Sequence, residues 1–237
     1  MLESLFSSLS GLNVASRKVQ ASANNLANLQ TPGFKSSRVN IVDSPSGGAR
    51  VSGVSRSGLQ GPLVPTNNPL DIAVQGNGFL QVGLAGGGTG FTRSGSLKVD
   101  GGGRLVTADG NPLLPEISIP GGAQTIRIGP GGRVSALVNG QTQTLGQLQL
   151  AGFQNPAGLS ALGNSLFGVS GSSGQPVAGN PGSNGLGTVQ SGFLEVSNVD
   201  ISEEMVQQIV ASTQFRANAN AIRAADDMTG SLLDITA

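Results

Sequence analysis

The uneven distribution of glycine and proline limits the fold of this 237-residue chain more than any other feature. Of the 38 glycines, only Gly11 lies in the first 30 residues and only Gly230 lies after residue 198, and all twelve prolines lie between Pro32 and Pro181. Both residue types interrupt helices and favour turns. The sequence therefore predicts long helices at both ends and strands joined by turns in the middle.

The N-terminal segment carries an apolar stripe with the 3-4 spacing of a heptad repeat. Its members are Leu2, Leu5, Leu9, Leu12, Ser16, Val19, Ala23 and Leu26. A helix over residues 2–29 would be about 42 Å long at 1.5 Å per residue. Two interpretations are open: a helix packed on its own domain, and a helix packed between subunits. The length of the stripe and the absence of a matching helix in the middle favour the second.

A second stripe follows a helix-start signal near the C-terminus. Asp200 can cap a helix with Glu203 at the third helical position, and Glu203 and Glu204 suit the positive end of the helix dipole. The stripe consists of Met205, Ile209, Ser212, Phe215, Ala219 and Ile222. We expect the two terminal stripes to be buried against each other and against copies in neighbouring subunits.

The middle of the chain alternates apolar and polar residues with the period of two that is typical of strands. Leu70, Ile72 and Val74 precede a Gly-Asn-Gly turn, and Leu80 and Val82 follow it. We predict an α+β fold with an antiparallel β-rich middle domain, in which the terminal helices form a coiled-coil-like layer in an assembly. The predicted divisions are an N-terminal helix (1–30), an extended connector (31–66), a β-rich domain (67–196) and a C-terminal helix (197–237).

Composition removes most classes of enzyme and ligand site. Cysteine, histidine, tryptophan and tyrosine are absent, which excludes disulfides, thiolate metal sites and histidine base catalysis. The 13 basic and 13 acidic residues balance, so nothing suggests a nucleic-acid partner. Fragments of nucleotide-loop patterns occur in the glycine clusters, but no lysine and no helix follow them as phosphate binding requires. We expect no enzyme, no cofactor, no metal and no small-molecule substrate.

The stretch ANNLANLQTPGFK, residues 23–35, combines amides with turn residues at the end of the first predicted helix. Asn25 and Asn28 fall off the apolar stripe, where their amides could bridge to the backbone of an adjacent chain. The turn motif is Thr31, Pro32, Gly33 and Phe34. Proline excludes the preceding residue from the helical region, glycine can adopt positive φ, and the phenylalanine can anchor the departing chain.

This stretch resembles the N-terminal signature of the bacterial flagellar rod and hook proteins, the axial family. Further blocks resemble the rod-protein β domain in the correct order: PLDIAVQGNGFLQV, FTRSGSLKVDGGGRLVTADGNPLLP and IRIGPGGRVSA. QLQLAGFQNPAGLSALGNSLF and GFLEVSNVDISEEMVQQI resemble its end and the start of its C-terminal helix. Together these blocks cover most of the chain.

The resemblance implies a structural subunit of the basal-body rod, the periplasm-spanning drive shaft that transmits torque from the motor to the hook. Its implied partners are copies of itself, neighbouring rod and hook proteins, the flagellar type III export apparatus and the surrounding ring bushing. The family is exported without a cleaved signal peptide, which agrees with the absence of a secretory signal pattern here. The subunit interface is then expected at Leu2, Leu5, Leu9, Leu12, Val19, Asn25, Leu26, Asn28, Met205, Ile209, Phe215 and Ile222.

One feature departs from the distal-rod pattern. Only 33 residues, Ser36 to Asn68, separate the GFK and PLDIAVQG blocks, whereas distal-rod proteins carry a longer insertion there. The β-domain blocks favour the distal rod, and the short connector leaves a proximal-rod protein open. A secreted β-rich adhesin or fibre module with a helical stalk is the alternative from another class, followed by a peptidoglycan hydrolase.

Overall fold

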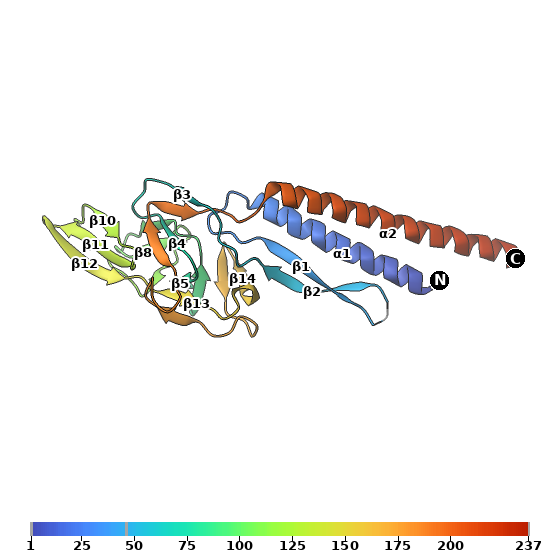
Figure 1. Cartoon of the computed structure of the whole chain (residues 1–237), viewed down its shortest axis with the longest axis horizontal. Coiled ribbons are helices and arrows are strands. Elements are labelled where there is room, and N and C mark those ends of the chain that lie inside the picture. The colour runs from blue at the N-terminus through green and yellow to red at the C-terminus, as the bar shows by residue number, and fades with distance from the viewer. Residues whose placement is uncertain (1, 46, 237) are drawn as a thin grey trace. The chain divides into compact units, whose positions relative to one another are not determined.

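The computed structural model describes residues 2–45 and 47–236, with side chains described over residues 3–45 and 47–231. The chain forms two compact units, whose elements are labelled in Figure 1. Unit 1 comprises Met1–Leu29, Ser36–Ser57 and Val199–Ala237, and unit 2 comprises Gln30–Lys35 and Gly58–Asn198. The chain therefore crosses between the units four times.

Unit 1 contains the two long helices predicted at the chain ends, α1 (Leu2–Ala27) and α2 (Ile201–Thr236). The side chain of Asp200 caps α2, because its Oδ1 accepts hydrogen bonds from the backbone N–H groups of Ser202 (2.8 Å) and Glu203 (3.1 Å). The predicted start of the second helix is thus confirmed. The carboxylate of Glu203 is ion-paired with Arg38, so it serves a tertiary contact.

The connector, predicted to be extended over residues 31–66, contains a β-hairpin in unit 1. Strands β1 (Ser37–Asp43) and β2 (Ala49–Arg56) pair antiparallel with Ser37 opposite Arg56. The hairpin packs on α1, where the Ala49 N–H donates to Ser10 Oγ at 3.1 Å. The strands are rich in β-branched residues, which favour this conformation. The hairpin was not predicted because a bulge between Asn40 and Ile41 interrupts the alternation of its apolar residues.

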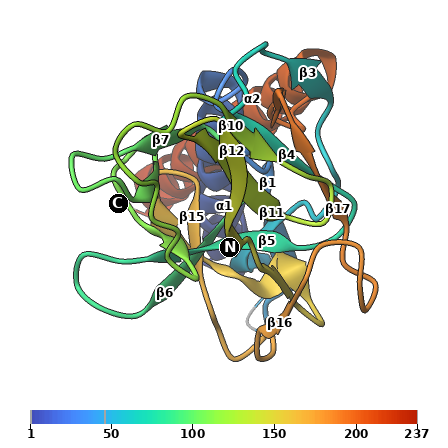
Figure 2. The ribbon, with the colours of Figure 1, turned by 90° about the vertical axis from the view of Figure 1, so that its left-hand side faces the viewer.

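Unit 2 is an antiparallel β structure, which confirms the α+β class and the β-rich middle (Figure 2). Its strands are β3 (Leu63–Pro65), β4 (Ile72–Gln75), β5 (Phe79–Gly83), β6 (Thr89–Thr92), β7 (Leu97–Val99), β8 (Leu105–Thr107), β9 (Leu113–Leu114), β10 (Ile126–Ile128), β11 (Arg133–Val138), β12 (Gln141–Gln147), β13 (Leu150–Gly152), β14 (Ser160–Gly163), β15 (Leu166–Gly168), β16 (Val177–Gly179), β17 (Thr188–Ser191) and β18 (Phe193–Glu195). A short 3₁₀ helix, Pro156–Gly158, precedes β14.

The strands of unit 2 form one large sheet and several small ones. The seven-stranded sheet has the order β14-β15-β6-β5-β13-β16, with β9 paired to β5, and β10, β11 and β12 form a separate three-stranded sheet. β17 pairs with β4, β18 with β3, and β7 with β8. The β3–β18 pair joins the beginning of the unit to its end, so the β structure starts before the predicted boundary at residue 67.

Unit 2 has its own apolar core. Its larger cluster is made of aliphatic side chains from most of the strands, such as Ile72, Leu80 and Leu150, which are almost completely buried. A second cluster is aromatic: the rings of Phe79 and Phe91 each meet Phe153 edge to face. This unit therefore buries its apolar side chains within one chain.

Candidate assembly surface

The two helices of unit 1 pack against each other through small side chains. Ala15 of α1 and Ala211 of α2 are completely or almost completely buried, as are Ser22 and Ala225. The hydroxyl of Ser22 donates to the backbone oxygen of Glu204 at 2.9 Å near the start of α2. Figure 1 shows the helices side by side, and these contacts make them antiparallel. We call this contact the small-residue seam.

The small-residue seam corrects one expectation about the apolar stripes. On α1 the seam consists of Gly11, Ala15, Lys18, Ser22 and Asn25. Each of these residues immediately precedes a residue of the predicted stripe in the sequence. One residue is about 100° around a helix, so the stripe lies on an adjoining face. The expectation that the stripes are buried against each other is therefore wrong within one chain.

The residues predicted to form the subunit interface differ in their exposure. Leu9, Leu26, Met205, Ile209 and Phe215 are exposed large apolar side chains, and Leu5, Leu12, Val19 and Ile222 are half-buried. The side chain of Leu2 lies outside the described residues. Most of the stripe is thus available on the surface of a single chain.

Part of this apolar surface lines a groove between the helices. Val19 lies on the α1 side of the groove, and Ile209 and Phe215 lie on the α2 side. The remaining lining residues are Ser16, Gln20, Gln208, Ser212, Thr213 and Arg216, and the cavity measures about 790 Å³. The stripes of both helices therefore border one concave, largely uncharged surface, which is the shape that a further helix can fill.

Asn25 has a different role from the one expected from the sequence. Its side chain is buried, and its Nδ2 donates to the Ser37 backbone oxygen (2.9 Å) and to Glu204 Oε1 (2.7 Å). Its Oδ1 accepts from the backbone N–H (2.8 Å) and the hydroxyl (3.0 Å) of Ser37. These four bonds use both donor hydrogens and both acceptor lone pairs of the amide within unit 1. Asn25 therefore holds α1, β1 and α2 together and does not bridge to an adjacent chain. Asn28 is half-buried, and its Nδ2 donates to the Asn24 backbone oxygen at 2.9 Å.

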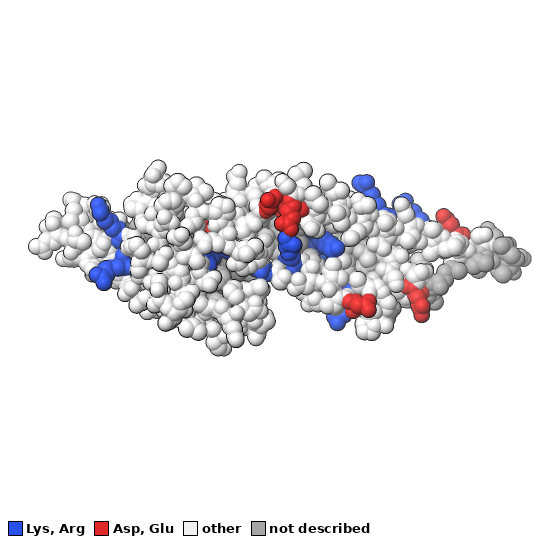
Figure 3. Space-filling model, viewed as in Figure 1, with Lys and Arg blue, Asp and Glu red and all other residues white. Residues whose placement is uncertain are grey.

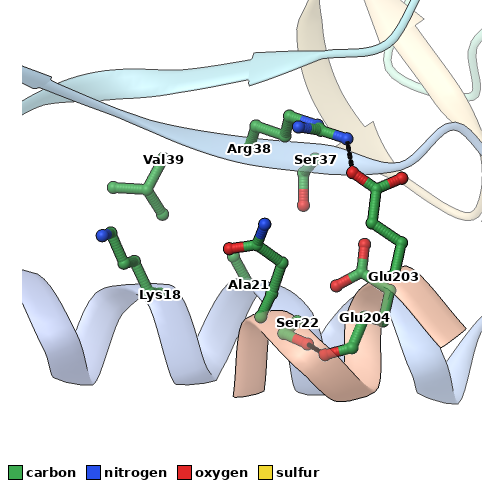
Figure 4. Close-up of a pocket in the computed structure, with 9 residues that line it drawn as sticks. Lys18, Ala21, Ser22, Ser37, Arg38, Val39, Glu203 and Glu204 are labelled. Carbon is green, nitrogen blue, oxygen red and sulfur yellow. Dashed lines mark hydrogen bonds and ion pairs between the residues drawn. The ribbon is translucent and has the colours of Figure 1, made fainter. Parts of the chain in front are cut away.

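A small polar pocket lies beside this network, where α1, β1 and α2 meet (Figure 4). Its volume is about 140 Å³, and its lining includes Lys18, Arg38, Glu203 and Glu204. Figure 4 shows Arg38 reaching from β1 to Glu203, with Glu204 directed toward the same space. Exposed ion pairs contribute little to stability. We therefore assign no binding function to this pocket and regard it as a solvated junction of three elements.

The turn after α1 confirms the conformation predicted for its glycine. Gly33 has φ of 69°, and a side chain there would place Cβ 2.3 Å from the Ser94 backbone nitrogen. The Gly33 N–H donates to the Glu195 backbone oxygen at 2.8 Å, and Phe34 is buried in unit 2. Thr31 and Pro32, also in unit 2, are half-buried. The turn is therefore specified by a close approach of two backbone segments.

A buried ion cluster follows this turn, and it was not predicted from the sequence. The carboxylate of Glu195, which is fully buried, accepts from Lys35 Nζ (2.5 Å), Arg93 Nη1 (3.1 Å) and the Gly61 N–H (2.9 Å). Lys35 Nζ also donates to the Leu59 backbone oxygen at 2.6 Å. The chain segments that enter and leave unit 2 are thus joined through one carboxylate.

Burial dominates the electrostatics of this cluster. Desolvation lowers the pKa of Lys35 below its ordinary value, although the Glu195 carboxylate opposes the shift. Desolvation also lowers the pKa of Arg93, whose guanidinium lies 5.2 Å from the Phe79 ring centre. Nη2 of Arg93 donates to the Gly76 oxygen at 2.7 Å, while its Nε is buried without a hydrogen-bond partner. Lys35 and Glu195 are 160 positions apart, so no sequence spacing could have connected them.

Charge is sparse over both units. Figure 3 shows only scattered charged side chains on the face in view, and charged residues make up 11% of the sequence. Within the described residues, no group of acidic residues has the arrangement of a metal site, and no helix has the length and apolar character to cross a membrane. The helix pair, in contrast, exposes several large apolar side chains, including Leu9, Ile209 and Phe215.

Comparison with known protein families assigns the class of this fold. The model described as "Flagella basal body rod protein" matches residues 5–35, and "Flagellar hook protein FlgE/F/G D1 domain" matches residues 73–136. "Flagellar basal body rod FlgEFG protein C-terminal" matches residues 190–235. The three matches fall on α1 with its turn, on the β structure and on α2. They define a rod or hook protein of the bacterial flagellum.

Curated relatives distinguish among members of this class. The flagellar basal-body rod protein FlgG of Buchnera aphidicola subsp. Acyrthosiphon pisum is 38% identical to this chain over an alignment of 253 positions, gaps included. The alignment covers 96% of this chain and 97% of the relative. FlgG of Borreliella burgdorferi is 37% identical (97% of each chain), and that of Bacillus subtilis is 35% identical (99% of each chain). The hook protein FlgE of Escherichia coli matches only 41% of this chain and 24% of its own length.

The chain belongs to the family of flagellar basal-body rod proteins named FlgG. It is a structural subunit of the rod in the flagellar basal body, and the family is not an enzyme family. The resemblance found in the sequence motifs is thereby confirmed.

Proposed function

We propose that this chain is a distal-rod subunit whose helix pair packs against the helix pairs of neighbouring copies. The helices form the coiled-coil-like inner layer of a tubular shaft that transmits torque from the motor to the hook. The observation that carries this proposal is the position of the apolar stripes beside, and not within, the small-residue seam. Each chain thus pairs its own helices and keeps a separate apolar face for a neighbour.

Exposed apolar area on the helix pair supplies free energy for assembly. Leu9 is 58% exposed and Ile209 is 64% exposed, although both follow the heptad spacing of a buried helix face. Covering one such side chain contributes about 1.5–3 kcal/mol when burial is complete. Repeated along two helices and around a closed tube, this contribution favours assembly over the free chain. The occupant of the groove is a second copy because it presents the same uncharged apolar stripes in return.

The position within the rod follows from the full-length relatives. They are FlgG proteins, the distal-rod members of the family, and the identity extends over nearly the whole of each chain. The short connector, which folds as the β1–β2 hairpin, leaves a proximal position as the second candidate. We infer export through the flagellar type III apparatus without signal cleavage, contact with neighbouring rod and hook proteins, and rotation inside a ring bushing. These follow from family membership.

Replacing Leu9 with Asp tests the proposal. An unpaired carboxylate in an apolar contact costs several kcal/mol, so packing between subunits should fail. Leu9 belongs to unit 1, and its side chain is exposed in the single chain. Unit 2 should therefore unfold at the same denaturant concentration as in the wild type. Cells carrying Leu9→Asp should export the subunit, build no complete rod and not swim. Basal bodies are examined by electron microscopy, and export is measured by immunoblotting outside the cytoplasm.

The matched control is Leu162→Asp. Leu162 is a leucine of similar exposure, 52%, on β14 of unit 2 and therefore outside the proposed contact. Cells with this control should swim. A full-length rod and normal swimming in Leu9→Asp cells would disprove the proposed contact. Fixed oligomers of the purified protein, in place of rod-like polymers, would support the fibre-module alternative.

A further inference from the structure

The strand β12 forms one outer edge of the three-stranded sheet in unit 2, because the strand order is β10-β11-β12. Figure 1 shows this sheet at the left-hand end of the unit. The first four residues of β12, Gln141–Thr144, are all exposed and pair regularly with β11. The bulge lies beyond them, where Leu145 has no partner in the register. Unit 2 thus presents a short, regular strand that is paired on one side only.

The unpaired side of β12 is open at the level of the backbone. The Leu137 N–H donates to the Thr125 oxygen, and the Leu137 oxygen accepts from the Gln124 N–H, both at 3.0 Å. Leu137 of β11 therefore directs its backbone groups away from β12. Thr142 lies opposite Leu137, and residues opposite each other in antiparallel strands either exchange both hydrogen bonds or both face away. The N–H and C=O of Thr142, and by alternation those of Thr144, therefore point outward from the edge.

The other outer strands of the two larger sheets of unit 2 carry features that hinder pairing. β10 packs against β17. β14 is interrupted by a register shift between Ala161 and Gly163, and β16 has three residues and lies between Pro176 and Pro181. Bulges, prolines, charges and covering elements are the means by which proteins protect an edge. The segment Gln141–Thr144 has no bulge, no proline and no charged side chain.

We propose that this edge of β12 pairs with a strand of a neighbouring copy in the rod, so that the three-stranded sheet continues across the subunit boundary. The outward backbone groups of Thr142 and Thr144 can bond to any extended segment. The occupant is a second copy because the chain is a rod subunit, and the assembly holds neighbouring copies beside it at high local concentration. An uncharged edge also brings no unpaired charge into such a contact.

The direction of the rod limits which segment of the neighbour can serve. A rod has two different ends, so its copies point the same way and their contacts are heterologous. The edge of β12 in one copy therefore meets a different segment of the next copy, and not the same residues in a two-fold arrangement. This inference rests on the proposed function in taking the neighbour to be a copy, but it does not depend on the helix contact tested by Leu9→Asp.

Amide hydrogen exchange tests the pairing in the wild-type protein. The outward amides of Thr142 and Thr144 should exchange fast in the purified chain. In isolated basal bodies they should exchange about tenfold more slowly or less, because a second strand accepts their hydrogen bonds. Mass spectrometry with electron-transfer fragmentation resolves the single amides. Equal exchange in the chain and in complete rods would overturn the pairing, while leaving the proposed helix packing untouched.

A proline substitution separates backbone pairing from side-chain contact. Thr142→Pro removes the outward N–H but none of the bonds to β11, and strands tolerate proline where the N–H faces solvent. The variant chain should unfold at the wild-type urea concentration, whereas its rods should dissociate at a lower one. The matched control Thr142→Val keeps the N–H, so its rods should match the wild type. Weakened rods in Thr142→Val, or rods of wild-type stability in Thr142→Pro, would contradict backbone pairing.

Photocross-linking identifies the occupant. The sequence contains no cysteine, so Gln143→Cys supplies a single site for a benzophenone maleimide beside the outward residues. In rods we expect a product of twice the chain mass, with the label joined to a segment outside residues 141–147. The control Ser160→Cys, on the bulged edge strand β14, should give no such product. Attachment to residues 141–147 of a second copy, attachment to a different protein, or no product from Gln143→Cys would each overturn the proposal.

Discussion

The two units of this chain bury apolar side chains in opposite ways. Unit 2 encloses large ones, such as Leu80 and Phe91, in a core made entirely from its own strands. In unit 1 the buried apolar residues are no larger than valine, and three of them are alanines such as Ala15 and Ala211, while large ones such as Ile209 remain on the surface. A unit that completes its core alone can fold alone. For a unit that leaves its largest apolar residues exposed, we expect much of the stability to come from neighbouring copies, as the proposed assembly requires.

Removing the centre of the ion cluster should have the largest effect on unit 2. Glu195→Ala leaves Lys35 and Arg93 buried without their shared carboxylate, and breaking such a group costs about 3–5 kcal/mol. Urea unfolding of the purified chain should show a much earlier transition of the β structure. Glu195→Gln keeps the shape and should lose less. An unchanged midpoint for Glu195→Ala would mean that the cluster is not needed for the stability of the unit.

A matched pair of leucines compares the two units directly. Leu80→Ala removes a side chain that is 1% exposed in the main core and should cost about 2–5 kcal/mol. Leu9→Ala removes an exposed one and should change the stability of the monomer by no more than about 0.5 kcal/mol. The same Leu9→Ala variant should weaken rod assembly, measured by counting complete rods in micrographs. Equal losses in the monomer would contradict the contrast between the units.

The turn that begins unit 2 should tolerate no side chain. Gly33→Ala combines positive φ with a close contact to backbone, so it should cost at least about 1–2 kcal/mol. Gly58→Ala is the comparison, because Gly58 has open space around it and no positive φ. Thermal unfolding followed by circular dichroism measures both. If the two variants melt together, the approach of Gly33 to the Ser94 backbone does not constrain the turn.

The smallest effect is expected at the start of α2. Asp200→Ala removes the acceptor for the Ser202 and Glu203 N–H groups and should cost about 0.5–2 kcal/mol. The loss should be local to unit 1, with faster amide exchange in the first turn of α2 and an unchanged unfolding midpoint for unit 2. Asp200→Asn, which retains an acceptor, should behave as the wild type. A shift of the unit 2 midpoint would show that the two units unfold together.

The sequence alone determined the features that depend on neighbours along the chain. The distribution of glycine and proline indicated the helical ends and the β-rich middle, and Asp200 marked a helix start. The Thr-Pro-Gly order indicated a turn in which Gly33 can adopt positive φ, as it does. These are properties of local backbone geometry. The ordered motif blocks also indicated the family, because each block is a pattern of consecutive residues.

Only the tertiary structure decided which helix faces meet and which distant groups share a site. The small-residue seam lies one position from the apolar stripe, because close approach selects small residues that carry no strong hydropathy signal. The sequence also led us to expect that Asn25 contacts an adjacent chain. Its actual partners, Ser37 and Glu204, are brought to it only by the folding of unit 1, so sequence patterns do not reveal them. The pairing of Lys35 with Glu195 spans 160 positions, and a contact at that separation is fixed by the fold of the whole unit, which local sequence patterns do not encode.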